Sequence, residues 1–238
     1  MADHALNAEI LELDRVDIAV EPFSWRFADE RGDDIAHYFA ALQRERPGVW
    51  NGRVLLLNRF AVAGRALQGA CFETDYASFI TWRNGEFPDP NVYNFFAAAA
   101  LRSADGAYLL GEMASYTAGA GRTYFCCGTP EPADIGASGT IDLDDNLSRE
   151  LLEETGIAVA EVDVEPGWTF VRDRCFLGFM KRLTARDDAD TLRQRIRRHI
   201  AAEQHPELAD MRIVRSAADI DARMPPSVVA FLERQWRR

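Results

Sequence analysis

The stretch SRELLEETGI (residues 148–157) places three glutamates, Glu150, Glu153 and Glu154, within five positions and then ends at glycine. On an α-helix, Glu153 and Glu154 lie about 60° and about 40° to either side of Glu150. They border an apolar stripe of three leucines, at positions 143, 147 and 151. Like charges at these spacings repel one another, and a divalent cation bound by the carboxylates would offset that repulsion. The spacing therefore indicates a metal site, although a solvated helix is the ordinary alternative for a glutamate-rich segment.

The helix that carries these glutamates has clear ends. Asp142 is a suitable N-cap, and Asp144 and Asp145 complement the positive end of the helix dipole. Gly156 supplies the residue that ends the helix. The sequence therefore predicts a helix over residues 143–155.

The composition limits the classes of function. The chain has 238 residues, is 47% hydrophobic and carries a formal net charge of −11, which argues against nucleic-acid binding because counterion release needs a basic surface. No apolar run is long enough to span a membrane, and the N-terminus does not resemble a secretory signal. The four cysteines form no CxxC pair and are expected to be reduced thiols. We therefore expect a cytoplasmic protein that binds neither nucleic acid nor membrane.

Two segments with different patterns suggest an N-terminal α+β extension (1–90) and a second domain (91–238), divided by the turn-rich NGEFPDPN (84–91). The mixture of strands and helices without regular βαβ alternation favours an α+β or α/β sandwich. In the extension we expect strands at 15–20 and 52–60 and helices at 33–46 and 75–83. In the second domain we expect strands at 92–102, 107–113, 122–128, 168–183 and 211–216, and helices at 188–204 and 225–238. The four alanines of 92–102 also allow a helix.

Residues 149–157, RELLEETGI, resemble the second half of the Nudix box, G-x5-E-x7-R-E-U-x-E-E-x-G-U, where U is a bulky aliphatic residue. The first half departs from the pattern, because isoleucines stand at 135 and 141, where glycine and glutamate are expected. One alignment uses Gly128 and Asp134 and requires seven extra residues before Arg149. The other uses Gly136 and Asp142 and is one residue short. We prefer the first because its turn follows the strand RTYFC.

The resemblance implies a Nudix-type α/β/α sandwich with a mixed sheet over residues 92–238. It also implies hydrolysis of the diphosphate linkage in a nucleoside diphosphate derivative, with Mg²⁺ or Mn²⁺ as cofactor. By the same resemblance, Glu153 and Glu154 would be the primary metal ligands and Glu150 a ligand or the base. Arg149 would orient the carboxylates, and the backbone carbonyl of Cys127 would complete the metal coordination.

Substrate and partner are less well defined by the sequence. Arg102 and Arg122 are candidates for binding phosphate, and a nucleotide-sugar or an ADP-ribose-like molecule is the favoured substrate. Four downstream glutamates are candidates for a further base: Glu161, Glu165, Glu203 and Glu207. The N-terminal 90 residues would shape a pocket for the second moiety or build a homodimer interface. The alternatives are a catalytically silent Nudix module that binds a nucleotide, and an unrelated metal-dependent phosphatase that shares the glutamate spacing by chance.

Overall fold

The computed structural model describes residues 8–237, and its centre is a nine-stranded mixed sheet. Six strands run across it in the order β1 (Glu9–Leu13), β10 (Trp168–Asp173), β11 (Phe176–Ala185), β5 (Asn94–Arg102), β6 (Tyr108–Met113) and β12 (Leu208–Val214). Three short strands add to them: β7 (Thr123–Tyr124), β8 (Cys126–Gly128) and β9 (Val162–Val164). The β11–β5 pair is parallel and the other pairs are antiparallel.

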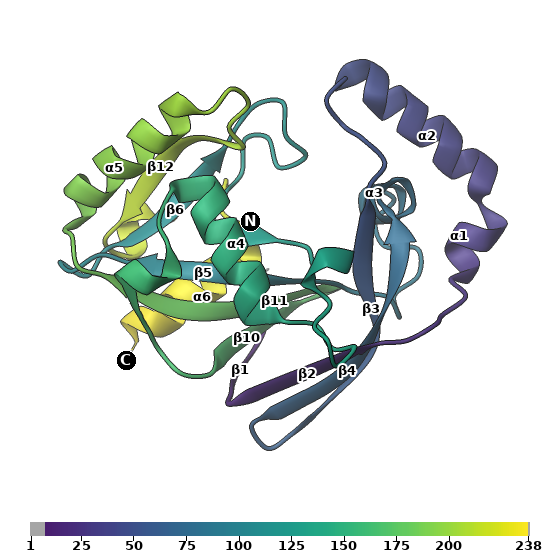
Figure 1. Ribbon diagram of the computed structural model, residues 1–238, viewed down its shortest axis with the longest axis horizontal. Helices are drawn as coiled ribbons and strands as arrows, with labels where there is room; N and C mark the ends of the chain where they lie inside the picture. The colour runs from purple at the N-terminus through teal and green to yellow at the C-terminus, as the bar shows by residue number, and fades with distance from the viewer. Residues whose placement is uncertain (1–7, 238) are drawn as a thin grey trace.

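Helices cover both faces of this sheet (Figure 1). Alternate residues of β5 point to opposite faces. Ala97 and Ala99 share a core with leucines of α4 (Leu143–Thr155) and with residues of α5 (Ala189–Ala202). Ala98 and Ala100 share a second core with α6 (Pro226–Trp236). The small alanine side chains allow helices to pack on each side of the central strand. The expected α/β/α sandwich with a mixed sheet is confirmed, and residues 92–102 form a strand.

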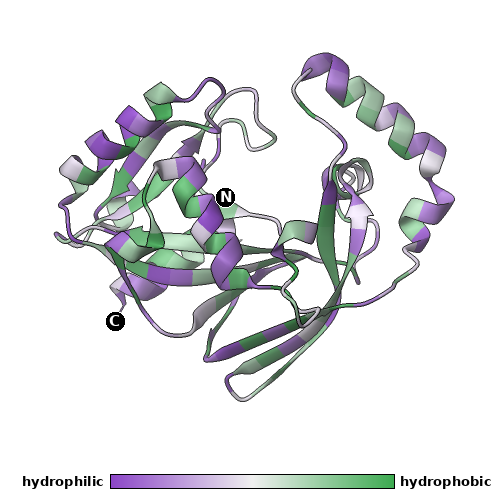
Figure 2. Ribbon diagram, viewed as in Figure 1, coloured by the Kyte–Doolittle hydropathy of each residue, from purple (hydrophilic) through white to green (hydrophobic). Residues whose placement is uncertain are grey.

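The N-terminal part folds around a separate three-stranded sheet in the order β2 (Arg15–Val20), β4 (Ala66–Asp75) and β3 (Arg53–Ala63). Helices α1 (Arg26–Glu30), α2 (Gly32–Glu45) and α3 (Tyr76–Asn84) cover one face of it through an aromatic-rich core. The other face contributes side chains to the core under α4. Figure 2 shows hydrophobic residues concentrated in the strands of both sheets, whereas α2 and α5 are hydrophilic on much of their length.

The two parts are joined by more than the chain connection at residues 84–91. Strand β1 pairs with β10 and so belongs to the large sheet, although it precedes the proposed boundary at residue 90. The backbone of Leu57 on β3 also exchanges hydrogen bonds with Tyr93, at 2.9 and 2.8 Å. The proposed division at residue 90 therefore separates the two sheets except for β1.

Three strand predictions need correction. Residues 122–128, expected as one strand, form two short strands, β7 and β8, which pair with β6 and β5. Residues 168–183, expected as one strand, form the hairpin of β10 and β11, whose turn includes Arg174 at a φ of 54°. Strand β12 begins at Leu208 and ends at Val214, earlier than the expected 211–216. Strand β4 was not among the expected elements. Among residues 8–237, no helix is long and apolar enough to cross a membrane.

Candidate active site

Helix α4 has the predicted bounds, Leu143–Thr155, and both predicted ends. The Asp142 carboxylate accepts a hydrogen bond from the Asp145 backbone at 2.9 Å. Gly156 has a φ of 69°, a conformation that side chains rarely adopt. A β-carbon at Gly156 would also lie 2.7 Å from His199 Nδ1. The chain therefore leaves the helix directly after the glutamates, with their positions fixed by local interactions at both ends.

Arg149 binds an aspartate that lies fifteen positions earlier in the chain. Its Nη2 donates to both carboxylate oxygens of Asp134, at 3.1 and 3.2 Å. The Asp134 side chain is only 1% exposed. It also accepts hydrogen bonds from the Asn146 amide at 3.0 Å and from the Glu131 backbone at 2.9 Å. The structure thus brings Asp134 to Arg149, whereas Asp142, the aspartate of the other alignment, caps the helix.

The seven residues 135–141 form a small closed loop. Ile135 and Ile141 pair as an antiparallel bridge, so the chain leaves and returns at the same place. Inside the loop, the Gly136 backbone donates to the Thr140 carbonyl at 2.9 Å. The loop also reaches the N-terminal sheet, because Ala19 of β2 forms a bridge with Thr140. These residues thus form an inserted loop that contacts the N-terminal part. Asp134, directly before the loop, stays next to α4.

Gly128 lies directly against the Glu150 carboxylate. A β-carbon at this position would lie 2.1 Å from Glu150 Oε1 and 2.3 Å from its Cδ, far closer than any side chain tolerates. Only glycine lets strand β8 and this carboxylate approach one another so closely. Glu150 also pairs with Arg149, at 2.8 Å, and is 15% exposed. The absence of a side chain at Gly128 is therefore what allows Glu150 to occupy its position.

The other two helix glutamates lie in contrasting environments. Glu153 is 61% exposed and its nearest Arg149 nitrogen lies 3.4 Å away. Glu154 is buried, and its Oε2 atom has no hydrogen-bond partner among the residues that the structure describes, 8–237. The Cys126 side chain and the Cys127 backbone, both on β8, interact with the Glu154 carboxylate. A buried carboxylate oxygen without a partner is costly, and a bound cation would offset that cost.

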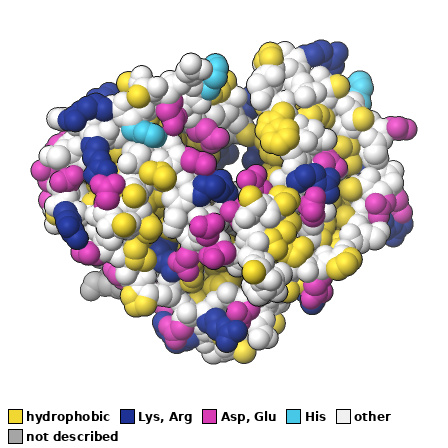
Figure 3. All heavy atoms as spheres, in the orientation of Figure 1, with side chains coloured by type: hydrophobic (Ala, Val, Ile, Leu, Met, Phe, Trp, Pro, Cys, Tyr) yellow, Lys and Arg dark blue, Asp and Glu magenta, His cyan; other side chains and the backbone are white. Residues whose placement is uncertain are grey.

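The acidic groups around β8 have raised pKa values. Burial raises the pKa of Glu150 to about 7, with Glu153 and Glu207 contributing and Arg149 opposing. Burial also raises the pKa of Glu154, and repulsion from Glu150 and Glu207 adds to it. The pKa of Glu207 is raised by desolvation and then by Glu153 and Glu203. Figure 3 shows acidic side chains gathered around the hollow between the two parts of the molecule.

The donor chemistry fits a hard divalent cation, since carboxylate and carbonyl oxygens are its preferred ligands. The orphaned Glu154 Oε2 and the Glu150 carboxylate against Gly128 are the observations that favour this fit. Within residues 8–237, however, no three acidic, histidine or cysteine side chains are close enough together to hold one ion as they stand. The residues that would hold the metal are Glu150 and Glu154, with the exposed Glu153 as a third candidate.

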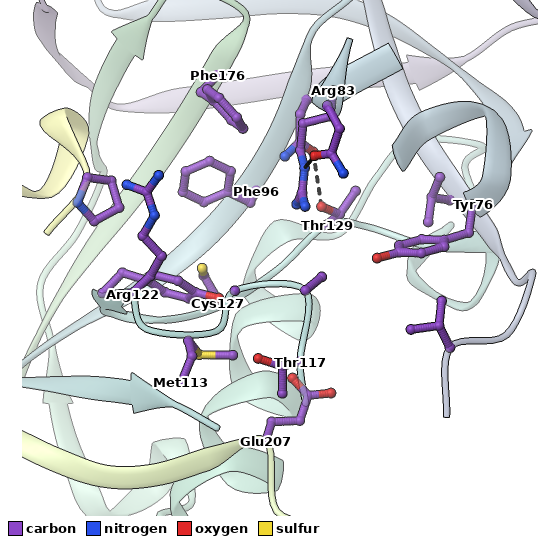
Figure 4. A pocket seen from close by; sticks show the side chains of 18 of the residues that line it. Tyr76, Arg83, Phe96, Met113, Thr117, Arg122, Cys127, Thr129, Phe176 and Glu207 are labelled. Carbon is purple, nitrogen blue, oxygen red and sulfur yellow. Dashed lines mark hydrogen bonds between the residues drawn. The ribbon is translucent and has the colours of Figure 1, made fainter. Parts of the chain in front are cut away.

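A cavity of about 1410 Å³ lies between the N-terminal part and the large sheet. Figure 4 shows Cys127, Glu207 and Arg122 at its wall, together with Phe96 and Phe176. The helix glutamates do not line it; the cavity approaches them through Cys127 and Glu207. Of the two predicted phosphate-binding arginines, Arg122 therefore lies at the cavity. Arg102 lies at the end of β5, donates to the Gly106 carbonyl at 3.3 Å and is not among the lining residues.

The structure also separates the four downstream glutamates. Glu161 pairs with Arg195 at 2.5 Å, Glu165 with Arg182 at 2.6 Å, and Glu203 lies 3.2 Å from His199. Glu207 is the one of the four that lines the cavity. On α5, the arginines at 193, 195 and 197 are all in ion pairs, as expected for a solvated helix face.

Several residues that line the cavity were not predicted from the sequence. Arg83 and Tyr76 come from α3, and Phe96 and Phe176 from β5 and β11. No motif contains them, and each also fits an ordinary core or surface position. Only the contact between the two parts of the chain brings them together.

No family model matches the sequence, and no curated protein matches it either. Solved structures similar to the chain include a Nudix hydrolase, RenU, of M. smegmatis, with 15% identity and a TM-score of 0.41, covering 61% of this chain and 87% of RenU. They also include the MutT protein of Methanosarcina mazei Go1, with 20% identity and a TM-score of 0.42, covering 61% of this chain and 94% of that protein.

Proposed function

We propose that this chain is a pyrophosphohydrolase that uses Mg²⁺ or Mn²⁺ to cleave the diphosphate linkage of a nucleoside diphosphate derivative. The observation that carries the proposal is the ion pair of Arg149 with the buried Asp134, beside the Glu150 carboxylate against Gly128. These contacts support the alignment that takes Gly128 and Asp134 as the first half of the Nudix-box pattern, with a seven-residue insertion before Arg149. A nucleotide-sugar or an ADP-ribose-like molecule is the proposed substrate.

In this proposal Glu150, Glu153 and Glu154 hold the metal with the Cys127 carbonyl. The metal, when bound, neutralises the diphosphate and lowers the pKa of a water molecule. Arg149 keeps the carboxylates oriented, because it bonds Asp134 on one side and pairs with Glu150 and Glu153 on the other. Arg122 binds phosphate oxygens in the cavity. Glu207 is the proposed proton acceptor, since its pKa is raised and it lines the cavity.

The size of the cavity supports a substrate with two moieties. Pockets for small ligands usually measure about 300–1,000 Å³, and this one measures about 1410 Å³. A cytoplasmic location and a homodimer stay predictions from the sequence.

The alternative is a module that binds a nucleotide without cleaving it. The exposure of Glu153 and its contact with Arg149 favour this alternative, because the three carboxylates do not yet converge.

Product analysis tests the proposal. The protein is incubated with Mg²⁺ and UDP-sugars, ADP-ribose, dinucleotides, coenzyme A or nucleoside triphosphates, with EDTA as the control. Release of a nucleoside monophosphate from a diphosphate derivative, abolished by EDTA, is the expected result. Metal-dependent binding without cleavage of any compound would favour the binding module, and cleavage of phosphomonoesters alone would favour an unrelated phosphatase.

A further inference from the structure

Arg83 is a cation in the large cavity that no acidic side chain among residues 8–237 neutralises. It lies in the last turn of α3, in the N-terminal part. Its contacts are the Asn84 side-chain oxygen at 3.3 Å and the Phe79 ring, whose centroid lies 5.6 Å away. Among residues 8–237, no carboxylate lies within ion-pairing distance of it. Most other arginines of the N-terminal part are paired, for example Arg53 with Glu73 and Arg59 with Glu21 at 2.6 Å each.

The surroundings of Arg83 make this lack of a counter-charge costly. Desolvation lowers the pKa of Arg83, and the nearby Arg122 guanidinium lowers it further. The groups that oppose this most are the hydroxyls of Tyr76 and Tyr124. Burial raises the pKa of both tyrosines, so they stay neutral at pH 7. A partly buried arginine that shares a cavity with a second arginine, with neutral hydroxyls nearby, suits the binding of an anion.

Arg122 is the second cation of this site. It precedes β7 in the large-sheet part, lines the same cavity as Arg83 and has no ion pair within the described chain. Figure 4 shows both arginines at the cavity wall with Phe96. The two guanidinium groups thus come from the two different parts of the chain. An anion bound between them would contact both parts at once.

Two phenylalanine side chains, Phe96 and Phe176, line the same cavity. Phe96 on β5 pairs in register with Gly178 on β11. A β-carbon at Gly178 would lie 3.1 Å from Phe96 Cε2, so the ring lies close over the glycine. Phe176 lies two residues before Gly178 and points to the same face of the sheet. Aromatic faces of this kind stack on planar rings such as nucleobases.

We propose that Arg83, together with Arg122, binds the diphosphate of a nucleoside diphosphate derivative whose base lies against Phe96 and Phe176. The substrate class rests on the proposed function, whereas the anion site rests on Arg83 and its surroundings. The diphosphate then extends toward Cys127 and Glu207, which line the same cavity. The N-terminal part is thereby a component of the substrate site, and Arg83 selects for a charged diphosphate over an uncharged nucleoside.

Binding measurements without metal test this inference independently of turnover. ADP, UDP, GDP and CDP, with the corresponding nucleosides, are titrated calorimetrically in EDTA against the wild type, Arg83→Gln, Arg83→Lys and Arg122→Gln. Arg59→Gln is the matched control, since Arg59 is in the same part of the chain but paired with Glu21 and outside the cavity. For the diphosphate that the wild type binds most tightly, we expect Arg83→Gln to lower the affinity at least about tenfold. Arg83→Lys should lower that affinity less, and Arg59→Gln should bind like the wild type.

The nucleoside should bind equally to the wild type and Arg83→Gln, and the thermal midpoint of Arg83→Gln should not fall, because an uncompensated cation is removed. Unchanged diphosphate binding by Arg83→Gln, or a wild type that binds none of the four diphosphates, would overturn the inference. If both proteins cleave the substrate and the KM of Arg83→Gln equals that of the wild type, the inference about Arg83 is overturned while the proposed function stands. Arg83-dependent binding without any hydrolysis would support it and remove the proposed function.

Discussion

The Arg149 guanidinium on α4 bonds both oxygens of the Asp134 carboxylate, which is 1% exposed and lies before a seven-residue loop. Proximity to Glu150 and Asp134 raises the pKa of Arg149, although desolvation opposes this effect. Arg149 therefore stays charged and links the loop after β8 to the helix. The contact fixes where the helix glutamates stand relative to Gly128.

Asp134→Asn should weaken both stability and activity. The substitution keeps the size of the side chain but removes a charge that Arg149 binds inside the protein, so we expect a loss of about 2 kcal/mol in unfolding free energy. Denaturant unfolding measures it. Asp163→Asn, on an exposed position of β9, is the matched control and should change stability by less than about 0.5 kcal/mol. Equal stabilities for the two variants would contradict the structural role of Asp134.

Gly128→Ala should displace the Glu150 carboxylate, because the new β-carbon would lie 2.1 Å from Glu150 Oε1. We expect a loss of turnover of roughly a hundredfold, the size typical of misplaced catalytic groups. Gly48→Ala serves as the control, since a β-carbon there meets nothing within 4 Å. Steady-state kinetics measure the turnover of the two variants. Full activity of Gly128→Ala would show that turnover does not depend on the observed position of Glu150.

Glu154→Gln and Glu153→Gln should both abolish turnover but differ in stability. Glu154 is buried with an unpartnered oxygen and a raised pKa, so a neutral amide should raise the thermal midpoint of the metal-free protein at pH 7. Glu153 is 61% exposed, and its substitution should leave that midpoint nearly unchanged. Thermal unfolding in EDTA compares them. A lower midpoint for Glu154→Gln would mean that its charge stabilises the fold.

The metal-free protein should lose stability as the pH rises from about 4.5 to about 7. Glu150 has a folded pKa of about 7 and an unfolded value near 4.3. In this range the folded state holds the proton more tightly, so the unfolding free energy falls with rising pH, by about 3 kcal/mol for this group. Denaturant unfolding at several pH values in EDTA tests the effect. Glu150→Gln should flatten the dependence, and an identical slope in both proteins would contradict it.

The parts of the site set by local interactions were predictable from the sequence. Helix α4 has the expected bounds because an aspartate cap and a glycine in the left-handed region fix its ends. The β10–β11 turn was missed because a non-glycine residue, Arg174, takes the positive φ there. No local pattern encodes that the loop at 135–141 pairs with β2, or that Arg83 and Arg122 line one cavity, because these arrangements join distant parts of the chain.

Mn²⁺ binding measured by electron paramagnetic resonance tests the central claim most directly, since that claim is that the carboxylates of α4 form a metal site. The wild type is compared with the double variant Glu150→Gln/Glu154→Gln and with Glu161→Gln, a control in which the altered residue pairs with Arg195 at the surface. We predict that the wild type and Glu161→Gln bind the metal and that the double variant does not. Equal Mn²⁺ binding by the wild type and the double variant would contradict the assignment of α4 as the metal site.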